Sequence, residues 1–358
     1  MSKSTANVKE KLTQREIMCH FPKVELHRHL EGTFSLPTLF RIATDNNIGL
    51  SADFEEFKKQ VQFPRDSEPD FLTFLSKFRN DWYRSHQDVY DITHDSVLEM
   101  ADDGIFYIEL RFSPEHFSYH NNFNREEITR LVIKAGNDAA AKANFQIRYL
   151  LTFNRSKQDQ YEMIQLYDKM KDMDIKEIVG VDLAGDETNN PPEDFTAFFD
   201  HVKRDNQYKI TIHAGEVTPS QQIWFSIQHL HADRIGHGVS AIHDIEVQKE
   251  LMKRDISLEQ CITSNYQTGS WADEAKHPLG DLYRAGVPVT INSDDPFIQD
   301  TDLTDDYIKA VQYFDLDIKD LIALNRTAIR TSFLTQKEKS ELSDSFDAKI
   351  AAFKKAYL

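Results

Sequence analysis

Two histidines near the start of the chain have the type and spacing of paired metal ligands. His27 and His29 lie in the segment VELHRHLEG at 24–32, which begins with alternating apolar residues and ends in a glycine. Residues i and i+2 of a β-strand point to the same face, so the two imidazoles would project side by side. A short HxH pair can also be two unrelated polar residues near a strand end, and the rest of the chain must decide.

Two residues later in the chain complete a set of metal ligands. His213 and Asp294 each follow a short apolar run, in HAGE at 213–216 and in NSDDP at 292–296. Three imidazoles and one carboxylate, with a position left for water, make a catalytic zinc site. Zinc lowers the pKa of its bound water to about 7, so that hydroxide forms at neutral pH. Taken alone, His213 could be a hydrogen-bonded core histidine and Asp294 a loop carboxylate or helix cap.

Three more polar residues could carry out the proton transfers of such a site. Glu216 follows His213 by three residues and could shuttle protons without binding the metal. His237 stands between two glycines and could hold the attacking water or stabilise an oxyanion. Asp295 would point away from its neighbour Asp294 and could accept a proton from a substrate ring nitrogen. Their ordinary alternatives are a solvated loop glutamate, a buried hydrogen-bonded histidine and a capping aspartate.

Short β-rich runs alternate with longer amphipathic segments along most of the chain. Eight runs are predicted to be strands, at 23–30, 105–112, 145–153, 178–183, 208–213, 232–237, 256–262 and 287–292. Helical periodicity marks the segments 125–142, 158–173, 193–203, 242–254 and 278–285. Alternating strands and helices imply parallel strands joined by right-handed crossovers. The sequence therefore predicts an α/β protein, a (β/α)8 TIM barrel of the kind that needs about 250 residues before insertions.

The remaining segments are expected to decorate one barrel domain over residues 1–358, because no repeat, low-complexity tract or linker divides the chain. Residues 1–20 read as a polar N-terminal arm or short helix, and 34–104 as a helical insertion after the first strand. The chain from Leu316 onward reads as a helical tail that closes the barrel. Five apolar residues of the insertion at helical spacing favour the core, although some could form a wall over a site: Phe71, Leu72, Phe74, Leu75 and Phe78.

Polar residues cluster where the predicted strands end. In barrel enzymes the active site forms at the C-terminal ends of the strands. We therefore expect the polar groups of seven strand ends to meet at one face. These groups are His27, His29 and Glu31; Glu109, Arg111 and Ser113; Asp182, Asp186 and Glu187; His213 and Glu216; Arg234 and His237; Thr263, Ser264 and Asn265; and Asn292, Asp294 and Asp295.

Composition limits the partners. The chain is 40% hydrophobic and 28% charged, which is ordinary for a globular protein, and its formal net charge is -17. So acidic a surface argues against a nucleic-acid backbone or an anionic membrane as the main partner, and leaves a small-molecule substrate open. Cys19 and Cys261 give no disulfide framework. Without a signal-peptide pattern or a membrane-length apolar stretch, we expect a cytoplasmic protein.

The motifs together resemble those of the adenosine deaminase family, in the adenyl-deaminase branch of the metal-dependent amidohydrolases. They occur in the family's order and cover nearly the whole chain beyond the first 20 residues: VELHRHLEG at 24–32, DLAGDE at 182–187, HAGE at 213–216, RIGHG at 234–238, TSN at 263–265 and NSDDP at 292–296. The resemblance implies hydrolytic deamination of adenosine, and of 2′-deoxyadenosine, to inosine and ammonia in purine salvage. It implies one Zn²⁺ per chain and no nucleotide cofactor.

The resemblance also implies roles for individual residues. The family's zinc ligands are matched by His27, His29, His213 and Asp294, of which His29 is also expected to border the substrate. Glu216 matches the glutamate that shuttles a proton from the water to N1 of the purine, and His237 the histidine that orients and activates that water. Asp295 matches the aspartate that pairs with N7. Gly185 matches the glycine whose N–H meets N3.

One residue departs from the usual pattern and keeps the substrate open. Glu31 stands where similar adenosine deaminases usually have an aspartate that contacts the ribose 5′-hydroxyl, and glutamate also occurs there in relatives that take free adenine. One more methylene is enough to weaken or relocate such a contact. The stretches 183–187 and 263–268 resemble the adenosine enzymes, so adenosine is expected first. Adenine, or a 5′-modified adenosine such as aminofutalosine, is the alternative substrate.

The sequence also has features that bear on three other classes of protein. A barrel hydrolase of amides or phosphoesters is open on fold alone, but relatives of that kind often carry a metal-bridging lysine at the end of strand four, where Gly185 and Asp186 stand. A non-catalytic binding protein on the same barrel predicts loss of a ligand or of Glu216, and all are present. Deaminases of bases within nucleic acid carry an HxE…PCxxC signature, which the sequence lacks.

Overall fold

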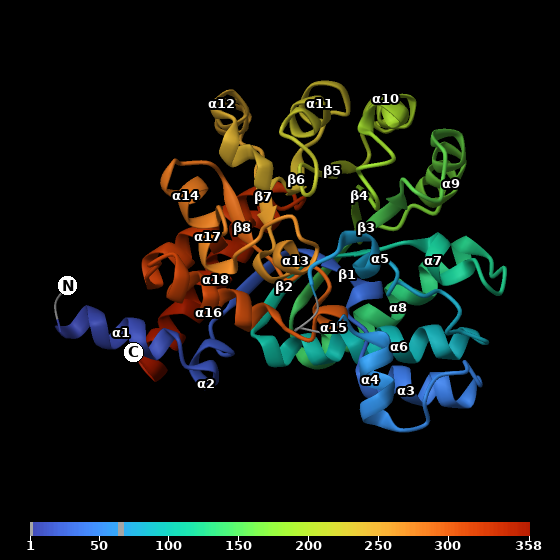
Figure 1. Ribbon diagram of the computed structural model, residues 1–358, viewed down its shortest axis with the longest axis horizontal. Helices are drawn as coiled ribbons and strands as arrows, with labels where there is room; N and C mark the ends of the chain where they lie inside the picture. Colours follow the sequence, from blue (N-terminus) through green and yellow to red (C-terminus); the bar gives the residue numbers. More distant parts are fainter. Residues whose placement is uncertain (1–2, 64–67) are drawn as a thin grey trace.

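The computed structural model describes residues 3–63 and 68–358. Its described strands form one eight-stranded parallel sheet that follows the chain order from β1 to β8 (Figure 1). The strands are β1 Lys23–His29, β2 Ile105–Phe112, β3 Gln146–Asn154, β4 Ile178–Ala184, β5 Lys209–Ala214, β6 Arg234–His237, β7 Ser257–Gln260 and β8 Val289–Ile291. The predicted (β/α)8 barrel is confirmed, with strand ends within a few residues of their predicted places.

The barrel closes between the first strand and the segment that follows the last. Arg28 and Asp294 form a parallel bridge. The His29 N–H donates to the Asp294 carbonyl over 3.0 Å, and the Asp294 N–H donates to the His27 carbonyl over 2.9 Å. Since three of these residues are the predicted metal ligands, the seam that closes the barrel also fixes the backbone of the candidate site.

Helices that cover the barrel match the five predicted segments and add one. The matching helices are α8 Arg125–Ala143, α9 Gln160–Asp172, α10 Thr196–Asp205, preceded by η3 Pro192–Phe195, α12 Ile245–Arg254 and α14 Leu279–Arg284. The added helix is α11 Gln221–His229. Local signals set the ends of α8, because the Asn124 side chain accepts from the Glu127 N–H and Asn144 ends the helix in the left-handed conformation.

The insertion and the short loop helices gather around the barrel. η1 Leu30–Gly32 directly follows β1. The insertion predicted at 34–104, of which residues 64–67 lie outside the described residues, contains α3 Leu36–Asp45, α4 Phe54–Val61, α5 Phe71–Leu75, α6 His86–Glu99 and η2 Met100–Asp103. Short helices follow several strands: α7 Pro114–Ser118, η4 Val239–His243, α13 Ile262–Gln267, η5 Glu274–Lys276 and α15 Pro296–Gln299. The insertion is helical, as predicted.

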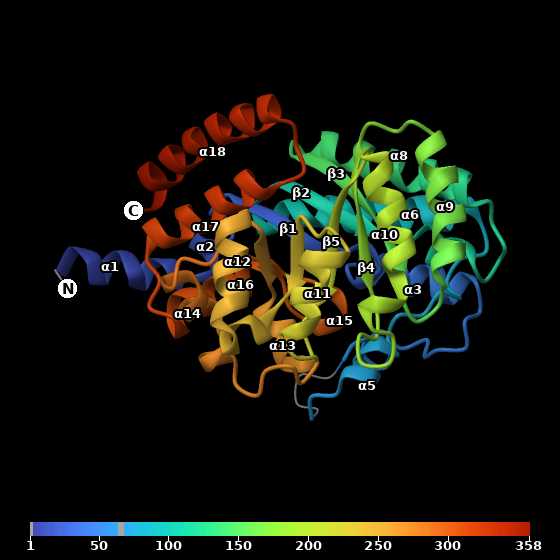
Figure 2. The same cartoon turned by 90° about the horizontal axis from the view of Figure 1, so that it is seen from above.

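The N-terminal arm and the C-terminal tail meet on one side of the molecule. The arm forms α1 Lys3–Leu12 and α2 Arg15–Met18, and the tail forms α16 Leu303–Tyr313, α17 Ile318–Thr331 and α18 Gln336–Tyr357. The Lys11 ammonium donates to the Tyr357 carbonyl over 3.0 Å, and both chain ends lie together in Figures 1 and 2. In Figure 2, α18 and α5 lie on opposite sides of the molecule. No helix of the described ranges is long and apolar enough to cross a bilayer.

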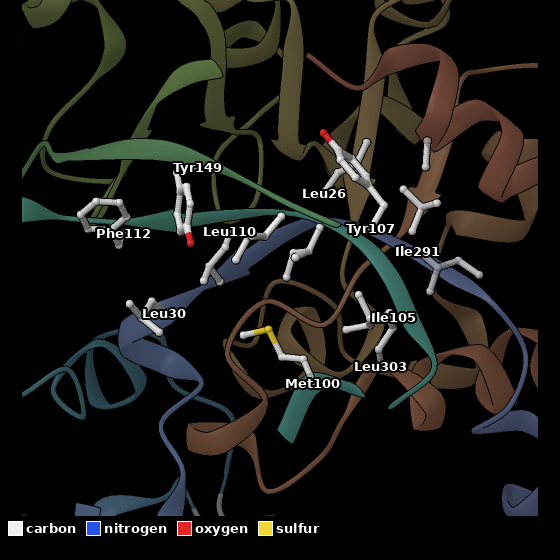
Figure 3. Packing of buried hydrophobic residues seen from close by; sticks show 14 of the residues in the cluster. Leu26, Leu30, Met100, Ile105, Tyr107, Leu110, Phe112, Tyr149, Ile291 and Leu303 are labelled. Carbon is white, nitrogen blue, oxygen red and sulfur yellow. The ribbon is translucent and has the colours of Figure 1, made fainter. Parts of the chain in front are cut away.

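One large apolar cluster fills the space between the sheet and the helices. Every residue of β1 and β2 is buried, as expected of a parallel sheet covered on both faces. Figure 3 shows part of this cluster, where Met100 of η2 lies near Ile105 of β2 and Leu303 of α16, and Phe112 of β2 lies beside Tyr149 of β3. The barrel wall that carries the site is therefore held from both sides.

The inside of the barrel holds a network of charged side chains rather than an apolar filling. Arg111 contacts Asp182 at 3.2 Å and Glu259 at 2.8 Å, while Arg234 contacts Glu109 and Glu259, both at 2.6 Å; all five side chains are fully buried. Although burial raises it, the two guanidinium groups hold the pKa of Glu259 well below its usual range. The expectation that Glu109, Arg111 and Arg234 reach the mouth is wrong: they face the interior, and Arg234 begins β6 rather than ending it.

Candidate active site

Four side-chain atoms from three parts of the chain converge at the C-terminal end of the barrel. Asp294 Oδ1 lies 3.2 Å from His27 Nε2 and 3.4 Å from His29 Nε2, and the Nε2 atoms of His29 and His213 are 3.2 Å apart. Among the described residues, His27 Nε2 and Asp294 Oδ1 are buried without a hydrogen-bond partner. Bonds of about 2.0–2.1 Å to a tetrahedral zinc put its ligand atoms roughly 3.3 Å apart. The donor set therefore fits one zinc ion.

The local backbone explains how these side chains meet. His27 and His29 alternate with Arg28 along β1, so both point inward, as the i, i+2 spacing predicts. His213 lies next to the last residue of β5. Asp294 has φ of 63°, a left-handed conformation that costs free energy in a residue with a Cβ. Such strain is typical of functional sites and turns this carboxylate back over the barrel.

Buried carboxylates hold two of the histidines from behind. His27 Nδ1 lies 2.7 Å from Glu259 Oε2, and His213 Nδ1 lies 3.0 Å from Asp182 Oδ1. A carboxylate beside Nδ1 accepts a hydrogen bond from the Nδ1–H group. The histidine proton therefore stays on Nδ1, and the lone pair of Nε2 is available to a metal. The sequence placed Asp182 among the polar residues at strand ends without giving it this role, and Glu259 was not predicted. A charged residue within an almost fully buried strand was the signal that could have found both.

Glu216 and His237 lie beside the four ligand atoms. His237 Nε2 is 3.7 Å from Glu216 Oε2 and 3.8 Å from Asp294 Oδ2. The Asn265 amide donates to His237 Nδ1 over 3.1 Å, while the Asn265 oxygen lies 3.0 Å from His277 Nε2. This pattern puts the proton of a neutral His237 on Nε2, facing the site. Asn265 was among the polar residues expected at this face, but its bond to His237 was not predicted.

Burial sets the protonation of this pair. It lowers the pKa of the His237 imidazole well below its usual value. Burial, followed by the negative charge of Asp294, raises the pKa of Glu216 well above the usual value for a carboxyl group. These shifts favour a neutral imidazole that can donate from Nε2 and the protonated form of the Glu216 carboxyl group.

A pocket of about 490 Å³ leads to these groups. All the predicted site residues except the fully buried His27 line it: His29, Glu31, Gly185, His213, Glu216, His237, Asp294 and Asp295. Asn154, the last residue of β3, and Ser156, Lys157 and Gln158 after it add polar side chains to the lining. The structure thus brings together the residues to which the sequence gave a ligand, proton-transfer or substrate-binding role, but Glu109, Arg111 and Arg234 do not line the pocket.

Two pocket residues, Gly185 and Asp295, could bind the edge of a planar ligand. Gly185 has φ of 103°, and a Cβ there would lie 2.8 Å from Asn154 Oδ1. Within the described residues its N–H donates to no protein group. Asp295 Oδ1 is buried without a described partner. A Cβ at Gly32 would lie 1.7 Å from that oxygen, so Asp295 can occupy its position only beside a glycine.

Glu31 is bound to the next strand. Its Oε1 accepts from the Ser113 N–H over 2.6 Å, and burial raises the pKa of this carboxyl to about 7. The side chain is 6% exposed and borders the pocket. The extra methylene, relative to aspartate, thus brings the carboxyl group within reach of the end of β2, while the residue still faces the pocket.

An apolar wall completes the pocket. Phe71, Phe74 and Leu75 of α5, together with Phe78, line it, whereas Leu72 is 59% exposed. Phe74 packs with Phe63 and Ile298 in a small buried cluster apart from the main one, so the expectation of a core position holds for Phe74. The half-buried Phe71 and Leu75 instead belong to the wall over the site. Helical spacing could not separate the two cases, because a core and a pocket wall require the same apolar side chains.

Comparisons with known proteins agree with this geometry. A family model described as "Adenosine deaminase" matches residues 22–349. The adenosine deaminase of Yersinia enterocolitica is 32% identical over 328 residues, which covers 90% of this chain and 97% of that protein. The adenine deaminase of Arthrobacter aurescens superimposes with a TM-score of 0.84 at 25% identity, over 92% of this chain and 99% of that one. The Arabidopsis N6-mAMP deaminase gives 0.81 at 26%, over 93% and 99%.

Proposed function

The chain belongs to the adenosine deaminase family, and we propose that this hydrolytic deaminase converts adenosine, and 2′-deoxyadenosine, to inosine and ammonia with one zinc ion. The observation that carries the proposal is the convergence of His27, His29, His213 and Asp294, at tetrahedral spacing, on the floor of a pocket. These four residues would hold the ion. When bound, zinc lowers the pKa of a water molecule to about 7 and so makes hydroxide available.

Glu216 and His237 manage the proton and the water. The Nε2–H of His237 points to the space beside Asp294 and would hold the attacking oxygen in line with C6. The Glu216 carboxyl would donate its proton to N1 of the purine as C6 is attacked, and it would take up the proton of the incoming water. Its raised pKa suits a group that must be protonated at neutral pH. The proton of the C6 hydroxyl then passes to the amino group, and ammonia leaves as the C6 carbonyl of inosine forms.

Gly185 and Asp295 would fix the orientation of the base. The Gly185 N–H, which donates to no group of the described residues, would donate to N3. Burial, and then the neighbouring Asp294 carboxylate, raise the pKa of Asp295 well above its usual value. A protonated Asp295 would therefore donate to N7, which is an acceptor. Two donors on opposite edges of the purine define a single pose in which C6 faces the candidate metal.

The size and lining of the pocket favour a nucleoside over a free base. The pocket of about 490 Å³ is lined by Asn154, Ser156 and Lys157 as well as by Glu31, and these polar side chains could contact a ribose. Free adenine has no hydroxyl groups to bind them. The binding of Glu31 to the Ser113 N–H keeps adenine as the second candidate, because it engages one oxygen of the carboxyl group expected to contact the ribose 5′-hydroxyl.

Ultraviolet absorbance separates these substrates in one experiment. Zinc-loaded protein is mixed in parallel with adenosine, 2′-deoxyadenosine, adenine and adenosine 5′-monophosphate, and each spectrum is followed with ammonia release. We expect the inosine-type change with both nucleosides and little with adenine. A fast change with adenine alone would preserve the chemistry and overturn the substrate. A change with the 5′-monophosphate alone would show that the substrate is a 5′-modified nucleoside.

A further inference from the structure

One carboxylate binds the backbone on both sides of Glu216. Glu187 lies in the loop after β4 and is 2% exposed. Its Oε2 accepts from the Gly215 N–H over 3.0 Å, and its Oε1 accepts from the N–H groups of Val217 and Thr218 over 2.5 Å and 3.0 Å. Both oxygens of this side chain are thus bound to the turn that carries Glu216.

The turn needs such a partner because of its conformation. Gly215 has φ of 67°, and a Cβ there would lie 2.4 Å from Ser240 Oγ, so the chain bends sharply just before Glu216. The bend aims three N–H groups at one point. N–H groups that converge in this way form a concave anion-binding site, and buried N–H groups without an acceptor are costly. Here the anion is a side chain of the same protein.

A second side chain holds the other end of the same segment. Arg155, in the loop after β3, donates from Nη2 to the His213 carbonyl over 2.7 Å and from Nη1 to the Asn190 carbonyl over 3.4 Å. It is 3% exposed, and Glu187 is the largest of the favourable charges acting on its guanidinium. The segment from His213 to Thr218, which carries a metal-ligand candidate and Glu216, is thus clamped through its carbonyl and its N–H groups.

This arrangement exceeds what burying a charge requires. A buried glutamate is often neutralised by one arginine, and Arg155 is near enough to act on Glu187. Glu187 instead accepts hydrogen bonds with both oxygens from three backbone N–H groups that flank Glu216. A shift of about 1 Å in a reacting group can cost about 10²-fold in rate, so holding this turn in place has a direct catalytic value.

We propose that Glu187 is a positioning residue for the deamination, which fixes the Glu216 carboxyl against N1 and the attacking water. The inference rests on the proposed function, because it assumes that Glu216 moves the proton. Glu187 does not line the pocket, and within the described residues it bonds to no side chain of a metal-ligand candidate. Its effect must therefore pass through Glu216, and this dependence can be measured.

The variant Glu187→Gln keeps the size of the side chain. Its amide oxygen can still accept from two N–H groups, but its NH2 group would face the third N–H, and the charge that strengthens all three bonds is lost. We expect kcat for adenosine to fall by about 10- to 100-fold. KM should change by less than about threefold, because Gly185 and Asp295 still bind the base. Zinc content should stay at one per chain.

A double-mutant cycle tests the route through Glu216. Glu187→Gln, Glu216→Gln and the double variant are compared with the parent for kcat, KM, metal content and melting temperature. If Glu187 acts through Glu216, the double variant is no slower than Glu216→Gln within about twofold. The matched control is Glu193→Gln, the same change at an exposed glutamate six residues away, which should leave all four quantities unchanged.

A binding measurement adds a readout that does not depend on turnover. A purine nucleoside analogue with a tetrahedral, hydroxyl-bearing carbon at the reacting position is titrated into each zinc-loaded variant by calorimetry. Glu187→Gln should weaken this analogue by about the same factor as kcat, while the affinity for inosine stays within about threefold. Comparable losses for the analogue and for inosine would overturn the positioning role.

The outcomes separate the two proposals. No turnover of adenosine by the zinc-loaded parent would refute the proposed function itself. An active parent, a slow Glu216→Gln and a normal Glu187→Gln would refute the positioning role alone. Multiplicative losses in the double variant, or a fall in zinc content that accounts for the lost rate, would also overturn it, since Glu187 would then act independently of Glu216.

Discussion

Replacing Glu259 by glutamine tests whether the charged barrel interior supports the candidate metal centre. Its Oε2 accepts from His27 Nδ1 over 2.7 Å and from Arg111 over 2.8 Å, and its Oε1 accepts from Arg234 over 2.6 Å and from Thr211 over 3.1 Å. The side chain is fully buried. Glutamine would remove the charge that two buried guanidinium groups share and would place an NH2 group against donors.

The expected size of the effect follows from this geometry. Removing one partner of a buried ion pair costs about 3–5 kcal/mol. A chain of 358 residues has an unfolding entropy of roughly 0.75 kcal/mol/K, so the melting temperature should fall by roughly 4–7 °C. Because the Nδ1–H of His27 would also lose its carboxylate, zinc affinity should fall by about 10- to 100-fold.

Two measurements check Glu259→Gln. Thermal unfolding of the metal-free proteins gives the stability term, and competition with a chromophoric chelator gives the zinc affinity. The control is Glu341→Gln, at a glutamate whose side chain is 64% exposed. If Glu259→Gln melts within about 1 °C of the parent and binds zinc equally well, the reasoning about the buried network is refuted.

Three further changes test other parts of the account. Gly32→Ala places a Cβ 1.7 Å from Asp295 Oδ1 and should lower kcat/KM for adenosine by at least about tenfold with zinc retained; unchanged steady-state kinetics would contradict the close approach. Asn265→Ala removes the donor to His237 Nδ1 and should lower kcat by about 10- to 100-fold; equal kcat at equal zinc content would show that this bond does not orient the imidazole. Burial raises the pKa of Asp306 to about 7. Between about pH 4 and 7 the folded chain therefore holds a proton that the unfolded chain has lost, and this group's contribution to stability falls as pH rises, by at most about 1.4 kcal/mol per unit. In urea unfolding, the stability of Asp306→Asn relative to the parent should increase from pH 5 to pH 8. A constant difference between their free energies of unfolding would disprove the raised pKa.

The fold could be predicted because its signals are local. Alternating short apolar runs and amphipathic segments define strands and helices one at a time, and the crossover rule then leaves few topologies. The helix α11 was missed because it is short and Trp224 on it is 40% exposed, which blurs its apolar stripe. Arg234 was placed at the wrong end of β6 because strand ends are the least certain part of such a prediction.

The residues of the candidate site could be predicted where their type and spacing are typical of metal ligands or catalytic groups. The i, i+2 spacing of His27 and His29 and the short polar motifs at strand ends pointed to residues that the structure brings together. The supporting residues could not be found in this way. Glu259 contacts His27 from 232 positions away, and only the register of eight strands brings them together. Glu187 was among the polar residues at strand ends, but its partners are backbone N–H groups, and a sequence does not show where these point.

The most direct test of the central claim is the reaction of adenosine with protein whose metal has been removed and then restored. The protein is treated with a chelator, dialysed, and titrated with zinc while inosine and ammonia are measured together. The account predicts no turnover without metal, recovery that saturates at one zinc per chain, and one ammonia for each inosine. Zinc-loaded, folded protein that leaves adenosine unchanged, or metal-free protein that deaminates it at the full rate, would contradict the account.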